Sequence, residues 1–197
     1  MGEKSEQKRS HIIDCARAVF AAKGFRAVTM KDIVEACQIS RGGLYLYFTA
    51  IEEIFLAVAR ADHDGGDSGS DSLPTEATPT DILALFMKEQ KKEILRKKDS
   101  LAVAVYEYYF AQYMARAKVA KKDNIPKRQF ETGVLILENL IGEGHAAGEF
   151  FCEDARGAAS NIMYALEGLK IMARTGGLSE AAVDRELLYI LQGLVVE

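Results

Sequence analysis

The chain has 197 residues, of which 49% are apolar, and a formal net charge of −4. This length and composition can bury one large core or two smaller ones, which excludes a wholly disordered protein. Residues 1 to 48 hold eight Lys or Arg against five Asp or Glu, whereas residues 49 to 80 hold one against seven. The overall charge excludes a general nucleic-acid coat, but the basic N-terminal segment permits a local contact with a polyanion.

The cysteines and the N-terminus indicate the compartment. Cys15, Cys37 and Cys152 are few and scattered, without CxxC spacing. This pattern argues against a disulfide framework and a structural zinc site. The first residues have no apolar signal core, and no apolar run approaches the roughly 18 residues of a membrane span. We therefore expect a soluble cytoplasmic protein that does not contact a membrane and has no metal or cofactor.

The first predicted element is a helix from about Ser5 to Lys23, stopped by Gly24. A second, short helix follows, because Thr29 and Asp32 have the spacing of a capping box, in which hydroxyl and carboxylate satisfy each other's backbone amides. This helix runs from about Met30 to near Gln38. The inward stripe of the first helix comprises Ile12, Ala16, Val19 and Phe20.

The third predicted helix lies between Ser40, which can cap it, and Phe48. Gly42 and Gly43 each cost roughly 1 kcal/mol relative to alanine in a helix interior. Such a pair is expected where another molecule must approach the backbone closely. Leu44 and Phe48 share the inward face. The alternative is a helical hairpin that is buried for packing alone.

Two short helices joined by a tight turn predict a helix-turn-helix, whose second helix enters the DNA major groove, about 12 Å wide. Arg41, Gly42, Gly43 and Tyr45 fall where such a helix meets base edges. Arginine can contact guanine or phosphate, and tyrosine hydroxyls can donate to phosphate oxygens. The complete predicted DNA-binding set is Thr29, Lys31, Ser40, Arg41, Gly42, Gly43, Tyr45 and Tyr47.

These residues belong to a longer pattern, which comprises Ile12, Ala16, Phe20, Lys23-Gly24-Phe25, Thr29, Asp32-Ile33, Ser40 through Tyr45, Tyr47-Phe48 and Glu52 or Glu53. The stretch from Ile12 to about Val58 thereby resembles the N-terminal domain of the tetracycline-repressor (TetR) family of transcription regulators. The resemblance covers about a quarter of the chain. It implies that Thr29, Ser40, Arg41, Gly43, Tyr45 and Tyr47 contact DNA.

Two positions depart from the family pattern. Gln38 stands where the family usually has a glycine in the turn, and a positive φ at this residue would be strained by roughly 1 kcal/mol or more. Ile51 stands where a lysine is common at the start of the fourth helix. One phosphate contact fewer predicts a slope of log K against log salt that is shallower by about 0.9.

A fourth helix is expected from about Ile51 to His63, followed by a Gly- and Ser-rich flexible connection over residues 64–79. This connection lies inside the second of two predicted domains, a DNA-binding domain over residues 1–50 and a ligand-binding and dimerisation domain over residues 51–197. Thr78, Pro79 and Asp81 predict the start of a fifth helix that runs to about Lys98.

The sixth predicted helix, Leu101 to Met114, is apolar around its whole circumference, so we expect it in the middle of a bundle. Its tyrosines are an expensive way to fill a core, because each buried hydroxyl needs a partner. They fit the lining of a ligand cavity, or equally the edge of the bundle with hydroxyls in water. The predicted pocket comprises Phe86, Tyr106, Glu107, Tyr109, Phe110, Tyr113 and Phe130.

A seventh helix is expected from near Pro126 to Gly148. The last two helices carry apolar stripes at alternating spacings of four and three, and the ninth has a second stripe beside the first. A second copy of the chain would explain this, as would a central place in the protomer's own domain. The predicted dimer interface, at the place where the TetR resemblance implies dimerisation, comprises Ala159, Ile162, Leu166, Leu169, Leu187, Leu191 and Leu194.

Together these elements predict an all-α protein of about nine helices, with an N-terminal three-helix DNA-binding domain and a C-terminal helical bundle. We expect a homodimeric transcriptional regulator, a repressor that a small hydrophobic or aromatic effector releases from a palindromic double-stranded DNA operator. A redox-sensing regulator acting through Cys152 is an alternative. An enzyme is not expected, since no HExxH, GxSxG or P-loop pattern occurs.

Overall fold

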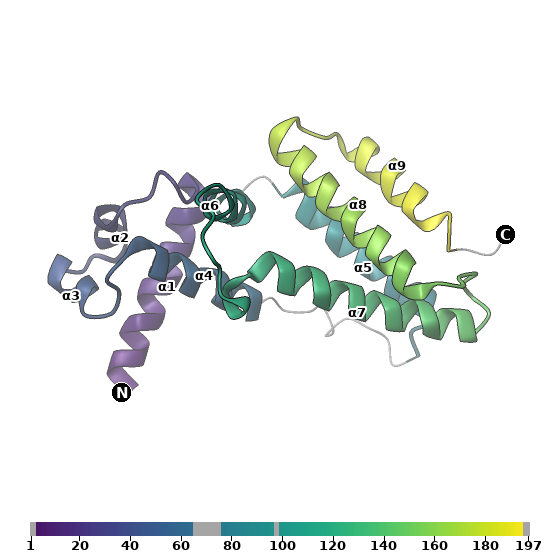
Figure 1. Cartoon of the computed structure of the whole chain (residues 1–197), viewed down its shortest axis with the longest axis horizontal. Helices are drawn as coiled ribbons and strands as arrows, with labels where there is room; N and C mark the ends of the chain where they lie inside the picture. The colour runs from purple at the N-terminus through teal and green to yellow at the C-terminus, as the bar shows by residue number, and fades with distance from the viewer. Residues whose placement is uncertain (1–2, 65–75, 97–98, 195–197) are drawn as a thin grey trace. The chain divides into compact units, whose positions relative to one another are not determined.

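The computed structural model describes residues 3–64, 76–96 and 99–194. Within these residues all regular structure is helical, which confirms the predicted all-α class (Figure 1). The helices are α1 (Glu3–Lys23), α2 (Met30–Cys37), α3 (Arg41–Tyr45), α4 (Ile51–Asp64), α5 (Pro79–Leu95), α6 (Ala102–Met114), α7 (Ile125–Ala146), α8 (Ala155–Thr175) and α9 (Glu180–Leu191), with a short 3₁₀ turn, η2 (Lys121–Asp123). No helix among them has the length and apolar character of a membrane span.

The chain divides into two compact units. The first comprises Met1–Gly66 and Lys98–Pro126, and the second comprises Asp67–Lys97 and Lys127–Glu197. This division differs from the boundary predicted at residue 50, because α4 and α6 contribute side chains to the same core as α1, α2 and α3. Most of the predicted flexible connection, residues 65–75, lies outside the described residues.

An aromatic cluster forms the centre of the first unit. Phe20 of α1 and Phe55 of α4 are both fully buried, and their rings meet edge to face with centroids 5.2 Å apart. Tyr108 of α6 packs against Phe55 at 4.9 Å and against Phe25, in the loop after α1, at 5.0 Å. Aromatic pairs in such tilted arrangements are favourable beyond the area they bury. The cluster therefore joins α1, α4 and α6 into one body.

The composition of α6 predicted a helix in the middle of a bundle, but the structure leaves one face of α6 exposed. Ala104 and Tyr108 are buried, but Phe110, Tyr113 and Met114 are 62%, 80% and 79% exposed. An apolar helix surface predicts burial only if neighbouring helices cover every side of it. The prediction was wrong for this face of α6, because the helix packs through its other side.

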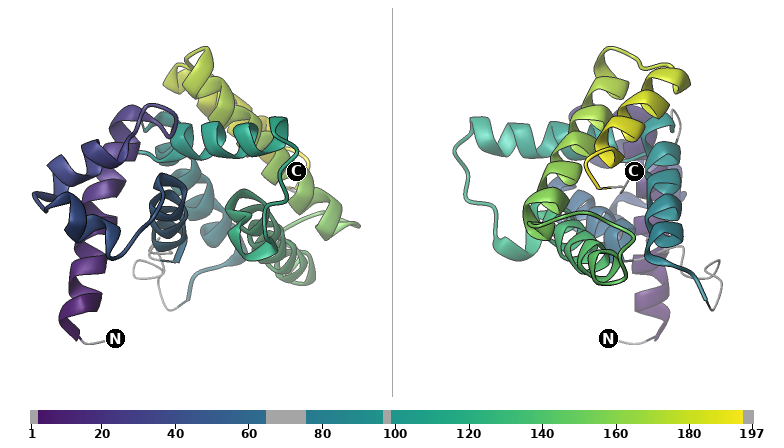
Figure 2. Two further views of the ribbon diagram at one scale, coloured as in Figure 1. Left: turned by 60° about the vertical axis from the view of Figure 1, so that its left-hand side comes forward. Right: turned by 90° about the vertical axis from the view of Figure 1, so that its right-hand side faces the viewer.

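The second unit contains α5, α8 and α9 together with most of α7 (Figure 2). Helix α8 lies beside both α5 and α9. Leu83, Leu137, Leu166 and Val183, one from each helix, are at most 3% exposed. Polar contacts add to this core: the guanidinium group of Arg174 in α8 donates to the carbonyl oxygens of two residues in the last turn of α5, at 2.8 and 3.0 Å. The second of these carbonyls, that of Glu93, also accepts the backbone N–H of Arg96 at 3.3 Å.

The turn between α2 and α3 contains a left-handed residue that is not glycine, which is the strained conformation considered in the sequence analysis. Gln38 has φ 54° and ψ 38°, and its backbone N–H donates to carbonyls of the last turn of α2. A left-handed residue at this place lets the chain reverse immediately after the helix. In this conformation the Cβ of glutamine lies too close to the following carbonyl oxygen. Glycine has no Cβ and therefore avoids this clash.

Replacing Gln38 by glycine should therefore stabilise the first unit. Removing the left-handed strain stabilises the protein by roughly 1–2 kcal/mol, and the greater freedom of glycine in the unfolded chain costs about 0.4–1 kcal/mol. From the midpoints of these ranges we expect a net gain of about 0.8 kcal/mol in the free energy of unfolding. Urea unfolding measures this value. The control is Gln38→Ala, which keeps a Cβ in the same conformation; equal stability of the two variants would contradict the strain.

Candidate nucleic-acid interface

The start of α2 is fixed by the predicted capping box. The backbone N–H of Asp32 donates to Oγ1 of Thr29 at 3.3 Å, and the N–H of Thr29 donates to Oδ2 of Asp32 at 2.8 Å. Lys23 Nζ also lies 2.6 Å from Asp32 Oδ1. The hydrogen bond from Lys23, followed by those from Thr29, holds the pKa of Asp32 well below its usual range. The carboxylate therefore stays ionised and keeps the first turn of α2 in place.

Helix α3 is held by one cap and one buried stripe. Its five residues are too few to be stable alone. The backbone N–H of Gly43 donates to Oγ of Ser40 at 3.0 Å, as predicted for a capping serine. Leu44 and Phe48 are 0% and 2% exposed and belong to the core of the first unit. The remaining faces of α3 are thereby left to solvent.

The two glycines of α3 differ in what surrounds them. A Cβ added to Gly43 would lie 3.1 Å from Oγ of the capping Ser40, so a contact within the protein explains the glycine at this position. A Cβ on Gly42 would meet nothing within 4 Å. Intramolecular packing therefore does not explain Gly42, which costs helix stability and gains no contact.

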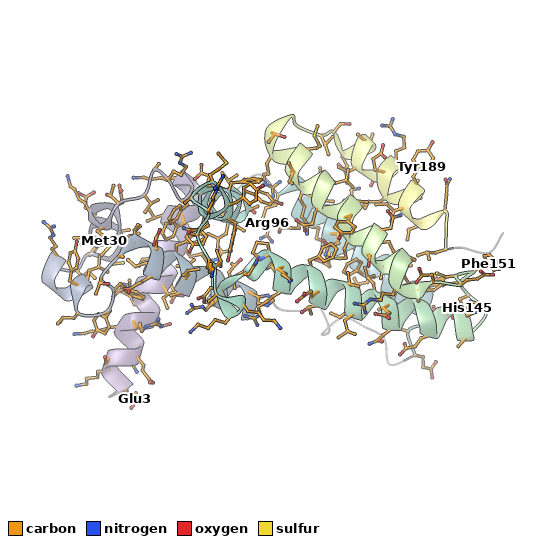
Figure 3. The ribbon with its side chains drawn as sticks, viewed as in Figure 1. Glu3, Met30, Arg96, His145, Phe151 and Tyr189 are labelled. Carbon is orange, nitrogen blue, oxygen red and sulfur yellow. The ribbon has the colours of Figure 1, made fainter. Side chains whose placement is uncertain are left out.

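All eight predicted DNA-binding residues lie at least partly on the surface, so burial for packing alone does not describe this hairpin. Gly43 and Tyr47 are half-buried and the other six are exposed. The guanidinium carbon of Arg41 lies 5.6 Å from the centroid of the Tyr45 ring, a cation–π contact that orients both side chains. Thr29, Lys31 and Arg41 also line one groove of about 320 Å³, which Met30 and Val34 complete. The labelled Met30 marks this end of α2 in Figure 3.

Two residues beside α3 or its flanking segment were not in the predicted set. Leu46, directly after α3, is 83% exposed although it is apolar. The guanidinium carbon of Arg9, in the first turns of α1, lies 5.0 Å from the centroid of the Phe48 ring. The sequence offered a signal for Arg9 in the basic start of the first helix, but none for Leu46, whose exposure follows from the packing of Leu44 and Phe48.

The start of α4 explains why Ile51 replaces the lysine that the family pattern favours. The Ile51 side chain is half-buried and packs against the core of the first unit. The N-terminus of α4 is instead ordered by Glu53, whose Oε2 accepts hydrogen bonds from the backbone N–H and the hydroxyl of Thr49 at 2.7 and 3.0 Å. These bonds lower the pKa of Glu53, the backbone bond most. The carboxylate also suits the positive end of the helix dipole.

The predicted effector residues are divided between the two units. Five of them, on α6, belong to the first unit, and Phe86 and Phe130 belong to the second. Glu107 and Tyr109, both on α6, make hydrogen bonds within the first unit. Glu107 Oε2 accepts the backbone N–H of Arg26 at 2.9 Å, and the Tyr109 hydroxyl donates to the carbonyl of Asp123 while it accepts the N–H of Ile125. Both side chains therefore order the first unit.

The predicted dimer stripe lies mostly inside the second unit. Five of its seven residues are between 0% and 7% exposed, so a partner cannot reach them. Leu169 and Leu191 are half-buried against the same core. This apolar stripe therefore belongs to the protomer's own core, because α8 and α9 pack against α5 through it. The five buried residues are Ala159, Ile162, Leu166, Leu187 and Leu194.

A different face of α8 and α9 is exposed. Tyr164 of α8 and Leu188 and Tyr189 of α9 are 67%, 63% and 61% exposed. Between the two helices lies an open groove of about 370 Å³, lined by Asn161, Ala165, Gly168, Leu169, Glu186, Tyr189 and Ile190. Figure 3 labels Tyr189 on α9. Of the second stripe predicted on the ninth helix, which comprised Leu188, Leu191 and Val195, Leu188 is exposed and Leu191 is half-buried against the core, and Val195 lies outside the described residues.

Across residues 3–64, 76–96 and 99–194, no three histidine, cysteine, aspartate or glutamate side chains come together as metal ligands do. The surface described above has the groups that contact nucleic acid, which are exposed hydroxyls, cations and a bare helix backbone.

Comparisons with known proteins agree with this geometry. Residues 12–58 match the family model described as "Bacterial regulatory proteins, tetR family". The HTH-type transcriptional regulator YfiR of Bacillus subtilis is 27% identical over 148 residues, which is 75% of this chain and 70% of that protein. The repressor AcnR of Corynebacterium glutamicum is 38% identical over 61 residues, about a third of each protein.

A solved structure extends the similarity to the whole fold. A transcriptional regulator from Saccharomonospora viridis, crystallised in complex with choline, has a TM-score of 0.81 and 19% identity, over 98% of this chain and 100% of that one. The shared arrangement includes an N-terminal helix-turn-helix and a helical C-terminal part. The matched motif, the relatives and this fold agree with one another. The chain therefore belongs to the TetR family of transcriptional regulators, with a DNA-binding helix-turn-helix formed by α2 and α3.

Proposed function

We propose that this TetR-family protein is a homodimeric repressor that a small hydrophobic or aromatic molecule releases from a palindromic operator. The observation that carries the DNA-binding part is the exposure of Thr29, Lys31, Arg41, Gly42 and Tyr45 on and beside α2 and α3. In this proposal α3 lies in the major groove, and its N-terminal residues reach base edges.

Gly42 is the most informative residue of this surface. The open space above it allows a groove wall to approach the backbone of α3 closely, and a methyl group there would keep the two apart. Arg41 stands beside it and can form a bidentate pair with guanine, worth about 1–3 kcal/mol of discrimination. Replacing Gly42 by alanine should therefore stabilise α3 and at the same time weaken DNA binding.

Gly42→Ala should weaken operator binding although it does not destabilise the protein. Alanine favours the helix by up to about 1 kcal/mol, and the added methyl group meets no protein atom within 4 Å. Arg41→Ala should weaken binding by about 1–3 kcal/mol. Fluorescence anisotropy with duplexes selected from random oligonucleotides on the wild-type protein measures the affinity, and thermal unfolding measures the stability.

Gly142→Ala is the matched control, because Gly142 is an exposed glycine of α7 whose added Cβ would also meet nothing within 4 Å. It should change DNA affinity by less than about twofold, the scale of a neutral surface substitution. Equal affinities of the Gly42→Ala, Arg41→Ala and wild-type proteins would exclude α3 as the reading helix.

The dimer is proposed to form through the exposed face of α8 and α9. Gly168 lies in the middle of α8 with nothing within 4 Å of an added Cβ, and it lines the groove beside Tyr189. A glycine there permits the close approach of a second copy, whose own Tyr189 can fill the groove under two-fold symmetry. Two recognition helices about 34–36 Å apart would then read consecutive turns of a palindrome.

Tyr189→Arg should convert the dimer into monomers, because two-fold symmetry places two desolvated charges in one interface. Sedimentation velocity measures the mass, and circular dichroism should show unchanged helicity. Leu135→Arg is the control, since Leu135 on α7 is 55% exposed and lies outside this face. A Tyr189→Arg protein that remains dimeric at micromolar concentration would place the interface elsewhere.

The effector is proposed to contact the exposed side of α6. Phe110, Tyr113 and Met114 together expose an apolar, largely aromatic surface on this helix. The same helix contacts the α1–α2 loop through Glu107 and the core through Tyr108. A ligand that binds α6 more tightly in one of two states would change the position of α2 and α3, with a coupling of typically 1–3 kcal/mol. The choline complex of the S. viridis protein supports small-molecule binding by this fold.

A small aromatic or quaternary-ammonium molecule, choline included, should raise the melting temperature and weaken operator binding. Tyr113→Ala and Phe110→Ala should each reduce the thermal shift, because they remove ring surface from the site. Phe151→Ala is the control, since Phe151 is a 65% exposed aromatic residue that is not part of α6. A ligand whose shift is equal in all variants would bind at another site.

A further inference from the structure

The structure brings two cysteines together that are separated in the sequence. Cys15 lies in the middle of α1 and Cys37 is the last residue of α2. Cys37 belongs to the core of the first unit, and the half-buried Cys15 packs against that core. The Cys37 thiol donates to the carbonyl of Ile12 at 3.9 Å, one turn of α1 before Cys15. The two side chains therefore face each other where α1 and α2 meet.

His11 connects the two cysteines. Its Nε2 lies 3.4 Å from the carbonyl oxygen of Cys37, a contact in which the ring nitrogen must be the donor. In the neutral ring Nδ1 is then the acceptor, and the Cys15 sulfur lies 3.9 Å from Nδ1 and 3.7 Å from Nε2. His11 can therefore take the proton of the Cys15 thiol while its other nitrogen holds the end of α2.

The two thiols differ in access. Cys37 is 4% exposed, whereas Cys15 lines an open groove of about 650 Å³ between α1 and α2. Burial, followed by the charge and the hydrogen bond of the adjacent Cys15, raises the pKa of the Cys37 thiol to about 12. Cys15 is therefore the thiol that a small oxidant reaches first, and Cys37 is placed to react second.

We propose that Cys15 and Cys37 are a redox-active pair, which a hydroperoxide converts into a disulfide between α1 and the end of α2. The Cys15 thiolate attacks the peroxide, the O–O bond breaks, and an alcohol leaves with one proton, so that Cys15 becomes a sulfenic acid. The Cys37 sulfur then attacks the Cys15 sulfur, the S–O bond breaks, and water leaves with the second thiol proton. Two thiols and one hydroperoxide give one disulfide, one alcohol and one water.

The disulfide would change the position of the recognition helix. Its formation shortens the distance between the two sulfurs from non-bonded contact to about 2.05 Å and requires a specific dihedral angle. The pull acts on Cys37, one residue before the left-handed Gln38 that sets the direction of α3. This consequence for DNA rests on the function proposed above, whereas formation of the disulfide does not.

The test is treatment of the full-length protein with hydrogen peroxide, followed by alkylation and peptide mass spectrometry under non-reducing conditions. We expect a linked peptide that contains Cys15 and Cys37, also in the Cys152→Ser variant. DNA affinity should fall roughly tenfold or more and return on reduction with dithiothreitol. Cys15→Ser, a half-buried position, should keep its affinity in peroxide and leave Cys37 reduced.

Several results would overturn the proposal: a linkage to Cys152 or between two chains, oxidation of Cys15 to the sulfinic acid without a linkage, or a linked protein of unchanged DNA affinity. If Cys15→Ser folds poorly, Cys15→Ala with the same peptide map replaces it. A reduced protein that binds no selected duplex would contradict the proposed function, and the peptide map would still decide whether the thiol pair exists.

Discussion

The burial of Phe20 against Phe55 is the interaction on which the first unit depends. Helices of eight and five residues, such as α2 and α3, do not persist in water by themselves, so their geometry must be imposed by a core. The aromatic cluster gives that core a rigid centre, and Ile33, Leu44 and Phe48 attach the two short helices to it. A surface that reads DNA needs such rigidity, because a displacement of about 1 Å at the recognition helix breaks a bidentate base contact.

The same core includes α6, and this changes the proposed route of regulation. The Tyr108 ring packs against both Phe25 and Phe55, and the Glu107 carboxylate binds the loop that leads into α2. A movement of α6 must therefore move the start of α2 or break these contacts. The polar groups that looked suitable for holding a ligand serve this internal connection, and the exposed face of the helix carries the apolar groups that the proposed effector would contact.

Glycines and cysteines show how differently one residue type is used within the chain. Gly43 leaves room for the capping Ser40, whereas Gly42 has empty space above it. Cys37 is a core residue, and Cys15 lies half-buried beside a groove. Only the three-dimensional surroundings of a residue show whether it is needed for folding or is available to contact another molecule.

The sequence by itself determined the local structure: the capping of α2 and α5, the left-handed Gln38, the cap of α3 and the place of Arg41 in the first turn of α3 all depend on residues within a few positions of one another. Tertiary structure decided the rest. Helical periodicity marks an apolar stripe but does not say whether the stripe meets its own core or a second copy, so the predicted dimer residues proved to be core. Likewise, no local pattern brings Cys15 to Cys37, because their proximity results from the packing of α1 on α2.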